Sequence, residues 1–207
     1  MVKKFGLLAL LLLPTALIAQ SSESATGGEA SVWVGAELSE FNPDYGCPTN
    51  SPFSCGYANI LIGPTAVFDF NLHGKWGLEG EARWLQFDGL QGEVESNYLA
   101  GPHYRLVRFH RMDVWGKLLL GGGWITTPGY PAAGSLKGSY FVEAPGVTFD
   151  YRLTRRMSLR GDYEYQRWPS FTGPPTYNPV TGGLNPNNSG LTPNGLSFGV
   201  VYKLLGP

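Results

Sequence analysis

The chain has 207 residues and a formal net charge of −1, so no basic field indicates nucleic acid as a partner. Charged residues make up 15% of the sequence, below the ~25% of ordinary soluble domains, while aromatic residues make up 14%. Beyond the N-terminal segment no apolar run is long enough for a membrane helix. The mature chain is therefore expected to be either soluble or a β-barrel.

The first residues have the pattern of a secretory signal peptide. Lys3 and Lys4 precede an apolar run over residues 5–13, Pro14 interrupts that run, and small residues follow to Ala19. The run is too short to span a bilayer as a stable helix. The alternative is a buried N-terminal helix. We predict cleavage after Ala19, and the absence of a nearby cysteine argues against a lipoprotein anchor.

Removal of residues 1–19 leaves about 188 residues, which is enough for one domain of ordinary size. Residues 20–29, QSSESATGGE, are polar and small, and we expect them to form a disordered leader. A single domain is predicted over residues 30–207.

Alternation of apolar and polar residues predicts eight strands in this domain. In chain order they cover about 30–41, 58–72, 76–87, 93–108, 112–124, 139–153, 157–168 and 194–204. Most are about twice as long as the five or six residues of an average strand. They are long enough for the roughly 9–11 tilted residues that cross a bilayer.

Short and long connections alternate between these strands. The predicted tight turns are His73-Gly74-Lys75, Phe109-His110-Arg111 and Thr154-Arg155-Arg156. The predicted loops cover 42–57, 88–92, 125–138 and 169–193. An even strand number with short turns at one end and longer loops at the other is typical of outer-membrane barrels. We therefore expect the turns and both termini to face the periplasm.

One hairpin pattern occurs twice. Residues 68–84, FDFNLHGKWGLEGEARW, align without a gap with residues 149–165, FDYRLTRRMSLRGDYEY. Each copy has one apolar face and one face rich in charges. A soluble sandwich would turn the charges to water, whereas a small membrane barrel would turn them inward. The hairpin alone does not distinguish the two.

Proline interrupts three of the predicted strands. The breaks are Gly63-Pro64, Gly101-Pro102 and Pro145-Gly146. Their similar positions before the tight turns indicate bulges or kinks that curve a closing sheet. The alternative is that each of these strands is split into two shorter strands.

The polar faces carry acids and bases in nearly balanced numbers. They comprise Glu37, Asp69, Glu79, Glu81, Arg83, Arg105, Asp113, Lys117, Asp150, Arg152, Arg160, Asp162, Glu164 and Lys203. Because unpaired buried charges are costly, we predict an ion-pair network inside the barrel. Its predicted members are Asp69, Glu79, Glu81, Arg83, Arg105, Asp150, Arg152, Arg160, Asp162 and Glu164.

Four of these acids, Glu79, Glu81, Asp162 and Glu164, could instead form a metal cluster. Arginines on the same faces favour ion pairing, so neither a metal nor another cofactor is predicted.

The segments FDYRL at 149–153 and LRGDYEY at 159–165 resemble the eight-stranded outer-membrane β-barrel family, the OmpA/OmpX-like group. The resemblance covers about residues 30–204. It implies an all-β, eight-stranded, antiparallel up-and-down transmembrane barrel in the outer membrane of a diderm bacterium. The expected partners are outer-membrane lipid and the assembly machinery, and we expect a monomer. Such barrels commonly end in an aromatic residue, whereas this chain ends in YKLLGP.

Catalysis is not predicted. His103 lies on the polar face beside Arg105, where it could serve as a general base. Some eight-stranded barrels modify lipid A with groups that face the lipid, but His103 should point inward and no His-x-Ser pattern accompanies it. His73 and His110 fall in predicted turns. The triplet at 121–123 lacks the lysine of a phosphate loop and is interpreted as a flexible strand end.

Cys47 and Cys55 are the only cysteines, and both lie in the first predicted loop of an exported chain. We expect them to form a disulfide. Closing so short a loop stabilises its geometry by roughly 2–3 kcal/mol in the chain-entropy model. A redox role would require the closer C-x-x-C spacing.

These patterns predict a non-enzymatic outer-membrane barrel with a side-chain-filled lumen. Its role would be structural, or recognition of an extracellular ligand through the long loops. The alternative is a soluble, lipocalin-like periplasmic barrel that binds a small ligand among inward apolar faces. A lipid A-modifying enzyme is the less favoured alternative.

Overall fold

The computed structural model describes residues 30–43, 60–72, 75–86, 94–126, 137–178, 183–187 and 190–206. The predicted signal peptide, the leader, Cys47 and Cys55 lie outside these ranges. The described ranges contain no helix of the length and apolarity that a membrane crossing requires.

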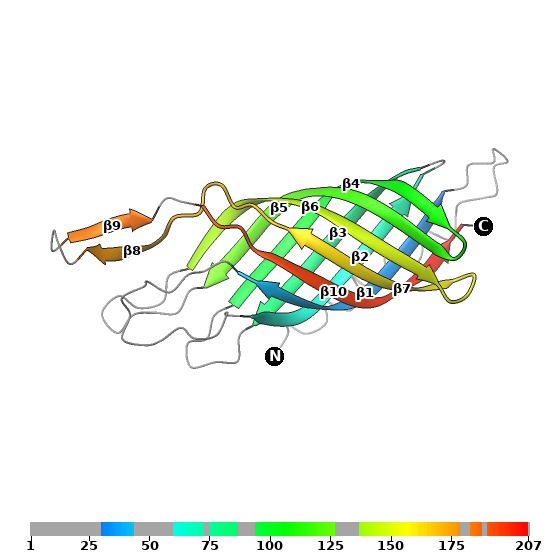
Figure 1. Ribbon diagram of the computed structural model, residues 1–207, viewed down its shortest axis with the longest axis horizontal. Coiled ribbons are helices and arrows are strands. Elements are labelled where there is room, and N and C mark those ends of the chain that lie inside the picture. The colour runs from blue at the N-terminus through cyan, green and yellow to red at the C-terminus, as the bar shows by residue number, and fades with distance from the viewer. Residues whose placement is uncertain are drawn as a thin grey trace, which may run out of the picture.

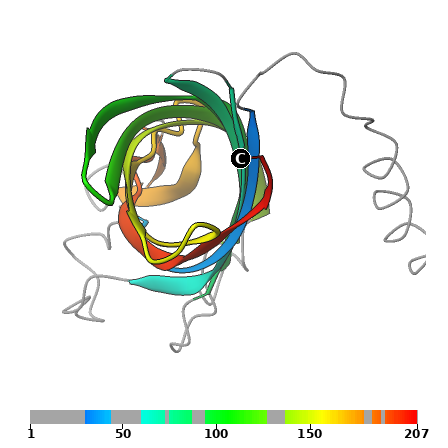
Figure 2. The same ribbon diagram turned by 90° about the vertical axis from the view of Figure 1, so that its right-hand side faces the viewer.

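Eight long strands form a closed antiparallel barrel (Figures 1 and 2). They are β1 (Ser31–Asn42), β2 (Leu61–Asn71), β3 (Trp76–Gln86), β4 (Val94–Phe109), β5 (Met112–Thr126), β6 (Lys137–Arg152), β7 (Met157–Tyr165) and β10 (Asn194–Leu205). Each strand pairs with its neighbours in the chain, and β1 pairs with β10 to close the ring. The predicted eight-stranded antiparallel barrel is confirmed.

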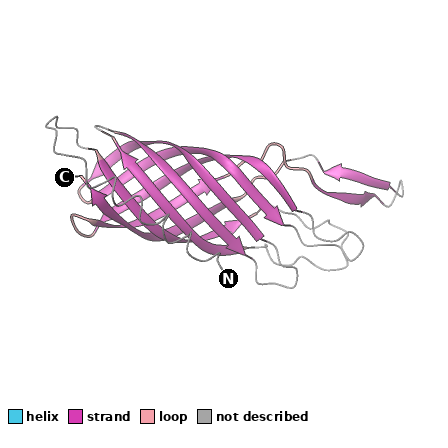
Figure 3. Cartoon of the chain, turned by 180° about the vertical axis from the view of Figure 1, so that it is seen from behind, coloured by secondary structure: helices cyan, strands magenta, loops and turns pink. Residues whose placement is uncertain are grey.

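The two ends of the barrel differ. The connections at 72–75, 110–111 and 153–156 are short and lie at one end, here called the turn end. The longer connections lie at the other end. Two short strands there, β8 (Gly173–Asn178) and β9 (Gly183–Asn187), pair as a separate hairpin that projects beyond the barrel (Figures 1 and 3). We call this the hairpin end.

Strand alternation places apolar side chains outside and charged ones inside. Leu78, Phe198 and Leu204 are exposed on the outer wall, whereas Glu79 and Ser197 beside them are buried. This arrangement is the reverse of the apolar interior that the lipocalin-like alternative requires. A wall with an apolar exterior and a polar interior is the pattern of a membrane barrel.

Aromatic side chains gather on the outer wall near both ends. Toward the hairpin end Trp84, Tyr98 and Trp124 make edge-to-face contacts, and Nε1 of Trp84 donates to the hydroxyl of Tyr98. Toward the turn end Trp76 packs edge-on against Tyr104. Their positions match the interfacial girdles of membrane barrels.

The proline breaks do not split their strands, because β2, β4 and β6 each run through them. They are not bulges in the register either: β2 keeps one register with β3 on both sides of Pro64. The ladder loses pairs there because proline has no N–H and because Gly63 lies against the carbonyl of Trp84. The shift in β4 lies later, between Arg105 and Val107, so the breaks in β2 and β4 are not register bulges, while a kink at these positions stays a prediction.

The segment after Tyr165 also differs from its prediction. The seventh strand was expected to reach Trp168, but β7 ends at Tyr165, and Arg167 and Trp168 make isolated bridges to Glu143 and Leu191. The loop expected at 169–193 contains β8 and β9, whose register shifts at the Pro174-Pro175 pair. Proline pairs weaken strand patterns in sequence but are tolerated at irregular positions of an edge strand.

Candidate functional site

The centre of the lumen is a network of buried ion pairs around Lys117 of β5. Its ammonium lies 2.8 Å from carboxylate oxygens of Glu79 and Asp162 and 3.6 Å from Glu164, and it also contacts Glu81. These are the four acids that could have formed a metal cluster. The ammonium group of Lys117 lies among them, so these four acids form ion pairs, as the sequence pattern favoured over a metal cluster.

Arg83 continues this network toward the hairpin end. Its guanidinium donates to Glu81 at 2.8 Å and to Glu164 at 2.9 Å, and it lies 4.1 Å from the ring centre of Phe41. Arg83 and Glu164 hold equivalent positions in the two copies of the repeated hairpin. The repeat therefore places complementary charges opposite one another across the lumen.

Arg160 continues the network toward the turn end. Nη2 donates to Asp69 at 2.6 Å, and Nε donates to Asp150 at 2.7 Å. Asp69 and Asp150 are also equivalent positions of the repeat. One guanidinium on β7 thus joins both copies and ties β2 to β6 across the barrel.

Two predicted members do not join this central network. Arg152 lies 3.4 Å from Asp113 at the turn end, where Arg108 also pairs with Asp113 at 2.6 Å. Arg105 is only half-buried, its guanidinium lies over the ring of Trp115, and its strongest charged neighbours are Arg108, Asp113 and Arg152. Arg105 keeps the register of His103, so its position follows from its depth near the turn end and not from the register shift that comes after it.

The expected balance of charges does not hold inside the barrel. Among the described residues eight carboxylates are buried, but only three arginine or lysine side chains are. The remaining bases are partly exposed near the ends. Alternation shows which face a residue is on but not its depth along the barrel axis, and the other bases on the polar faces lie near the ends.

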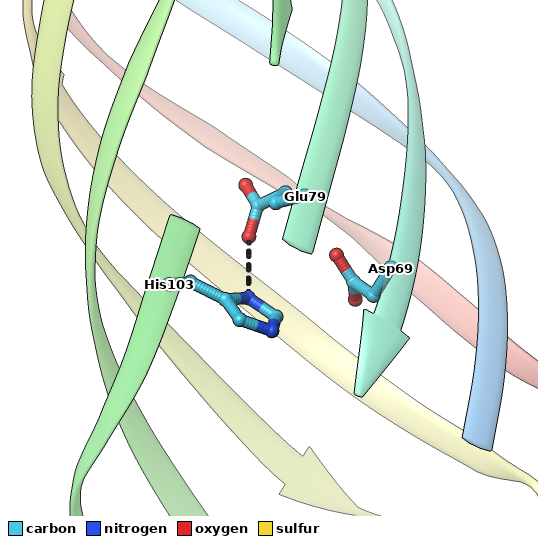
Figure 4. Close-up of side chains that lie close together, drawn as sticks. All are labelled: Asp69, Glu79 and His103. Carbon is cyan, nitrogen blue, oxygen red and sulfur yellow. Dashed lines mark hydrogen bonds and ion pairs between the residues drawn. The ribbon is translucent and has the colours of Figure 1, made fainter. Parts of the chain in front are cut away.

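His103 of β4 points into the lumen, as predicted. Its ring stacks on Trp115 with 4.5 Å between the ring centres. Nδ1 lies 3.2 Å from Oε2 of Glu79 (Figure 4). Nε2 lies 2.8 Å from Oδ1 of Asn71. Gly77 leaves room for the ring, because a Cβ there would lie 2.0 Å from Nε2. His103 therefore faces other lumen side chains rather than lipid.

A chain of hydrogen bonds leads from the ion pairs to the hairpin end. Gln166 donates to Glu164 at 2.7 Å and accepts from the indole Nε1 of Trp168 at 2.8 Å. Asn97 donates to Glu95 at 2.8 Å. Gln166 therefore links the Trp168 indole to the ion-pair network and fixes the orientation of its ring.

An apolar cluster, here called the cap, lies in the lumen at the hairpin end. Trp168 is fully buried there among inward side chains of β4, β5 and β6 and two residues of the long connection. The cap consists of Leu99, Leu119, Ile125, Val142, Ala144, Trp168, Phe171 and Leu191. Backbone hydrogen bonds in both directions join Trp168 to Leu191. The cap therefore combines side chains of three barrel strands with side chains of the connection between β7 and β10.

Gly123 makes this cap possible. A Cβ at Gly123 would lie 2.4 Å from the Trp168 ring. The triplet at 121–123 is accordingly part of β5, and its interpretation as a flexible strand end was wrong.

The sequence contained signals for some of what the predicted network omitted. Lys117 shares a strand face with Asp113 and Trp115, so the period of two places it inside, although it is not among the predicted members of the ion-pair network. The alternation of β7 continues to Trp168, since Gln166 and Trp168 are buried and Arg167 between them is exposed, but it does not indicate that Trp168 packs in an apolar cluster.

No protein-family model matches the sequence, and no curated protein matches it. Solved structures do match. Neisserial surface protein A aligns with a TM-score of 0.56 at 10% identity, over 86% of this chain and 99% of its own. OprG from Pseudomonas aeruginosa aligns with a TM-score of 0.58 at 12% identity, over 85% and 96%.

Ail, the attachment invasion locus protein of Yersinia pestis, was solved in complex with the heparin analogue sucrose octasulfate. It aligns with a TM-score of 0.50 at 15% identity, over 86% of this chain and 100% of its own. All three alignments cover at least 85% of this chain, whose strands form the closed eight-stranded ring described above. This chain therefore has the fold of the eight-stranded outer-membrane β-barrels.

Proposed function

We propose that this protein is a closed, non-enzymatic barrel of the bacterial outer membrane that acts in recognition at the cell surface. The observation that carries the proposal is that the lumen is filled at two levels. Buried ion pairs surround Lys117, and an apolar cap surrounds Trp168. An eight-stranded barrel is just wide enough for its own side chains, so these two levels leave no aqueous pore.

The proposed location rests on the outer wall. Its apolar surface lies between aromatic groups near both ends, as a bilayer-spanning barrel requires. Export through a cleaved signal peptide and insertion by the outer-membrane assembly machinery are part of the proposal. The turn end would face the periplasm and the hairpin end would face the medium.

The hairpin end has the composition of a recognition surface. The segments at 127–136 and 169–193 contain no Asp, Glu, Lys or Arg; they are rich in Gly, Pro, Asn, Ser and Thr, and each contains one tyrosine. Tyrosine with small polar residues also dominates antibody paratopes, because it provides rigid contact area at low entropic cost. The lack of bases disfavours a polyanion such as the ligand of Ail. We propose an uncharged glycan or a protein surface as the ligand.

Conductance tests whether the lumen is closed. The purified mature chain in planar bilayers should give only small or rare channel events. Steady conductance of porin size would contradict the proposal and would imply a wider or oligomeric pore.

Surface labelling and adhesion test the recognition role. A cysteine introduced into β8–β9 should react with an impermeant maleimide on intact cells, whereas one at Arg155 should react only after the envelope is ruptured. Cells that produce the protein should be retained on immobilised neutral glycans or extracellular proteins. Deletion of residues 173–187 should remove this retention and leave the barrel folded. Retention that is unchanged by the deletion would assign recognition to another loop.

A further inference from the structure

Three lumen side chains from neighbouring strands converge near the turn end. They are Asp69 of β2, Glu79 of β3 and His103 of β4 (Figure 4). All three are buried, and one potential ligand atom from each lies within 4.8 Å of the other two. Asp69 and Glu79 are directly opposite each other in the β2–β3 register.

Each carboxylate gives only one oxygen to the neighbouring base. Oε1 of Glu79 accepts from Lys117 at 2.8 Å, which leaves Oε2 facing His103. Oδ2 of Asp69 accepts from Arg160 at 2.6 Å, while Oδ1 is buried without a hydrogen-bond partner. Figure 4 shows the Asp69 carboxylate turned toward the other two side chains. A buried carboxylate oxygen without a partner is costly, which is an observation independent of the acidic cluster itself.

The histidine ring requires a positive species at the same point. Oδ1 of Asn71 can only accept a hydrogen bond, so Nε2 of His103 carries the ring proton in that contact. Nδ1 then presents a lone pair toward Oε2 of Glu79, 3.2 Å away. Two lone pairs at this distance repel unless a cation lies between them. A metal ion meets that need; so does a second ring proton, or an exchange of the Asn71 amide oxygen and nitrogen that lets Nδ1 carry the single ring proton.

The geometry fits a metal ion. A tetrahedral zinc ion with bonds of about 2.0–2.2 Å holds its ligand atoms roughly 3.3 Å apart. The nitrogen–oxygen distance of 3.2 Å is close to that separation. The contact of Nε2 with Asn71 is the usual support for a metal-bound histidine, because it fixes the tautomer and the ring orientation. The surplus of buried carboxylates over bases gives the ion a favourable field.

We propose that Asp69, Glu79 and His103 bind a divalent first-row transition cation of the zinc class, with Nδ1 of His103 and one oxygen of each carboxylate as ligands. Imidazole nitrogen with carboxylate oxygen favours such an ion over calcium or magnesium, which take oxygen ligands. Three protein ligands leave one position for water. Entry is from the turn end, where Asn71 and Asp150 are partly exposed.

Zinc binding to the untagged, detergent-solubilised mature chain tests this site. After treatment with a chelator, calorimetry should give one Zn²⁺ per chain, and Co²⁺ should give visible d–d absorption. Zn²⁺ should be added both to folded protein and during refolding, so that slow entry into the lumen cannot hide binding. Asp69→Asn and His103→Gln should abolish the stoichiometric binding. Asn71→Ala should weaken it by about 10–100-fold, as expected for a residue that orients a ligand.

The fluorescence of Trp115 provides a second measurement, which would not change on metal addition if His103 had only a structural role. Because its ring stacks on His103, Cu²⁺ or Co²⁺ bound there should quench its fluorescence, and Trp115→Phe should remove that part of the quenching. The matched control is His110→Gln, a histidine in the exposed turn at 110–111, which should leave binding unchanged. Folding of every variant is checked by its heat-dependent electrophoretic mobility.

Two results would overturn the proposal. One is a wild-type chain that binds no stoichiometric Zn²⁺ or Co²⁺ under either protocol, which would assign the contact between Nδ1 and Glu79 to a ring proton. The other is a folded His103→Gln variant that binds Zn²⁺ as tightly as the wild type. If His103→Gln does not fold, the Asn71→Ala affinity and the Trp115 quenching decide, and failure of both rejects the site.

Discussion

The lumen is filled in different ways in its central and turn-end part and at its hairpin end. From its centre toward the turn end the lumen is filled by charged side chains that all come from long strands, around Lys117 at the centre and Arg160 nearer the turn end. At the hairpin end it is filled by apolar side chains, and Trp168 reaches them from chain beyond β7. The ion pairs join opposite walls of the barrel, whereas the cap joins the barrel to the long connection. Damage to the first should affect the whole barrel, and damage to the second should mainly affect the hairpin end.

Loss of the central ammonium should have the largest effect. Lys117→Met removes the only side chain that contacts all four acids Glu79, Glu81, Asp162 and Glu164 among the described residues. Breaking a buried ion pair by removing one partner costs about 3–5 kcal/mol, because the other charge remains buried and unpaired. Urea unfolding of the barrel in lipid vesicles measures this loss. Arg155→Ala, in an exposed turn, is the control and should leave the midpoint unchanged; equal midpoints for the two variants would contradict a structural role of the network.

Loss of the cap tryptophan should come next. Trp168→Ala removes a fully buried ring and should destabilise by about 3 kcal/mol. It should also speed proteolysis within residues 173–187, because the backbone bridge to Leu191 loses its packed neighbour. Conductance should stay low, since the ion pairs still fill the lumen. A large rise in conductance would show instead that the cap is the main seal.

A smaller effect should follow from one methyl group beneath the cap. Gly123→Ala places a Cβ against the Trp168 ring and should cost about 1–3 kcal/mol through displacement of the ring. Gly80→Ala is the matched control, because the nearest atom to its Cβ would lie 3.9 Å away. Trp168 fluorescence in a variant that keeps only this tryptophan measures the displacement. An unshifted spectrum with Gly123→Ala would show that the cap can adjust.

The smallest effect on the barrel is expected at the predicted disulfide. Cys47 and Cys55 lie in the first connection, outside all eight long strands. Replacing both with serine should loosen that connection and leave the unfolding midpoint of the barrel nearly unchanged. Denatured, unreduced wild-type protein should contain no free thiol, and a count of two would reject the disulfide.

The sequence was most informative where one local rule repeats many times. Alternation with a period of two assigned Asp69, Glu79, Arg83 and Asp162 to the interior, and the structure places each of them there. It put Arg105 on the same face as His103 but gave no depth along the barrel axis, and Arg105 lies near the turn end, close to Arg108, Asp113 and Arg152. The alternation also continues past the end of β7, since Gln166 and Trp168 are buried and Arg167 is exposed, but it does not show the apolar cluster that Trp168 joins.

The sequence by itself determined eight strands, their two faces and a repeated hairpin that carries complementary charges. These features follow from the pleat of a single strand, which turns successive side chains to opposite sides. Only the closed barrel decided which charges meet. Arg83 pairs with Glu164 and Arg160 with Asp69 because closure brings β3 opposite β7 and β2 opposite β7 across a narrow lumen. The cap and the convergence of Asp69, Glu79 and His103 were likewise set by depth along the barrel axis, which alternation does not encode.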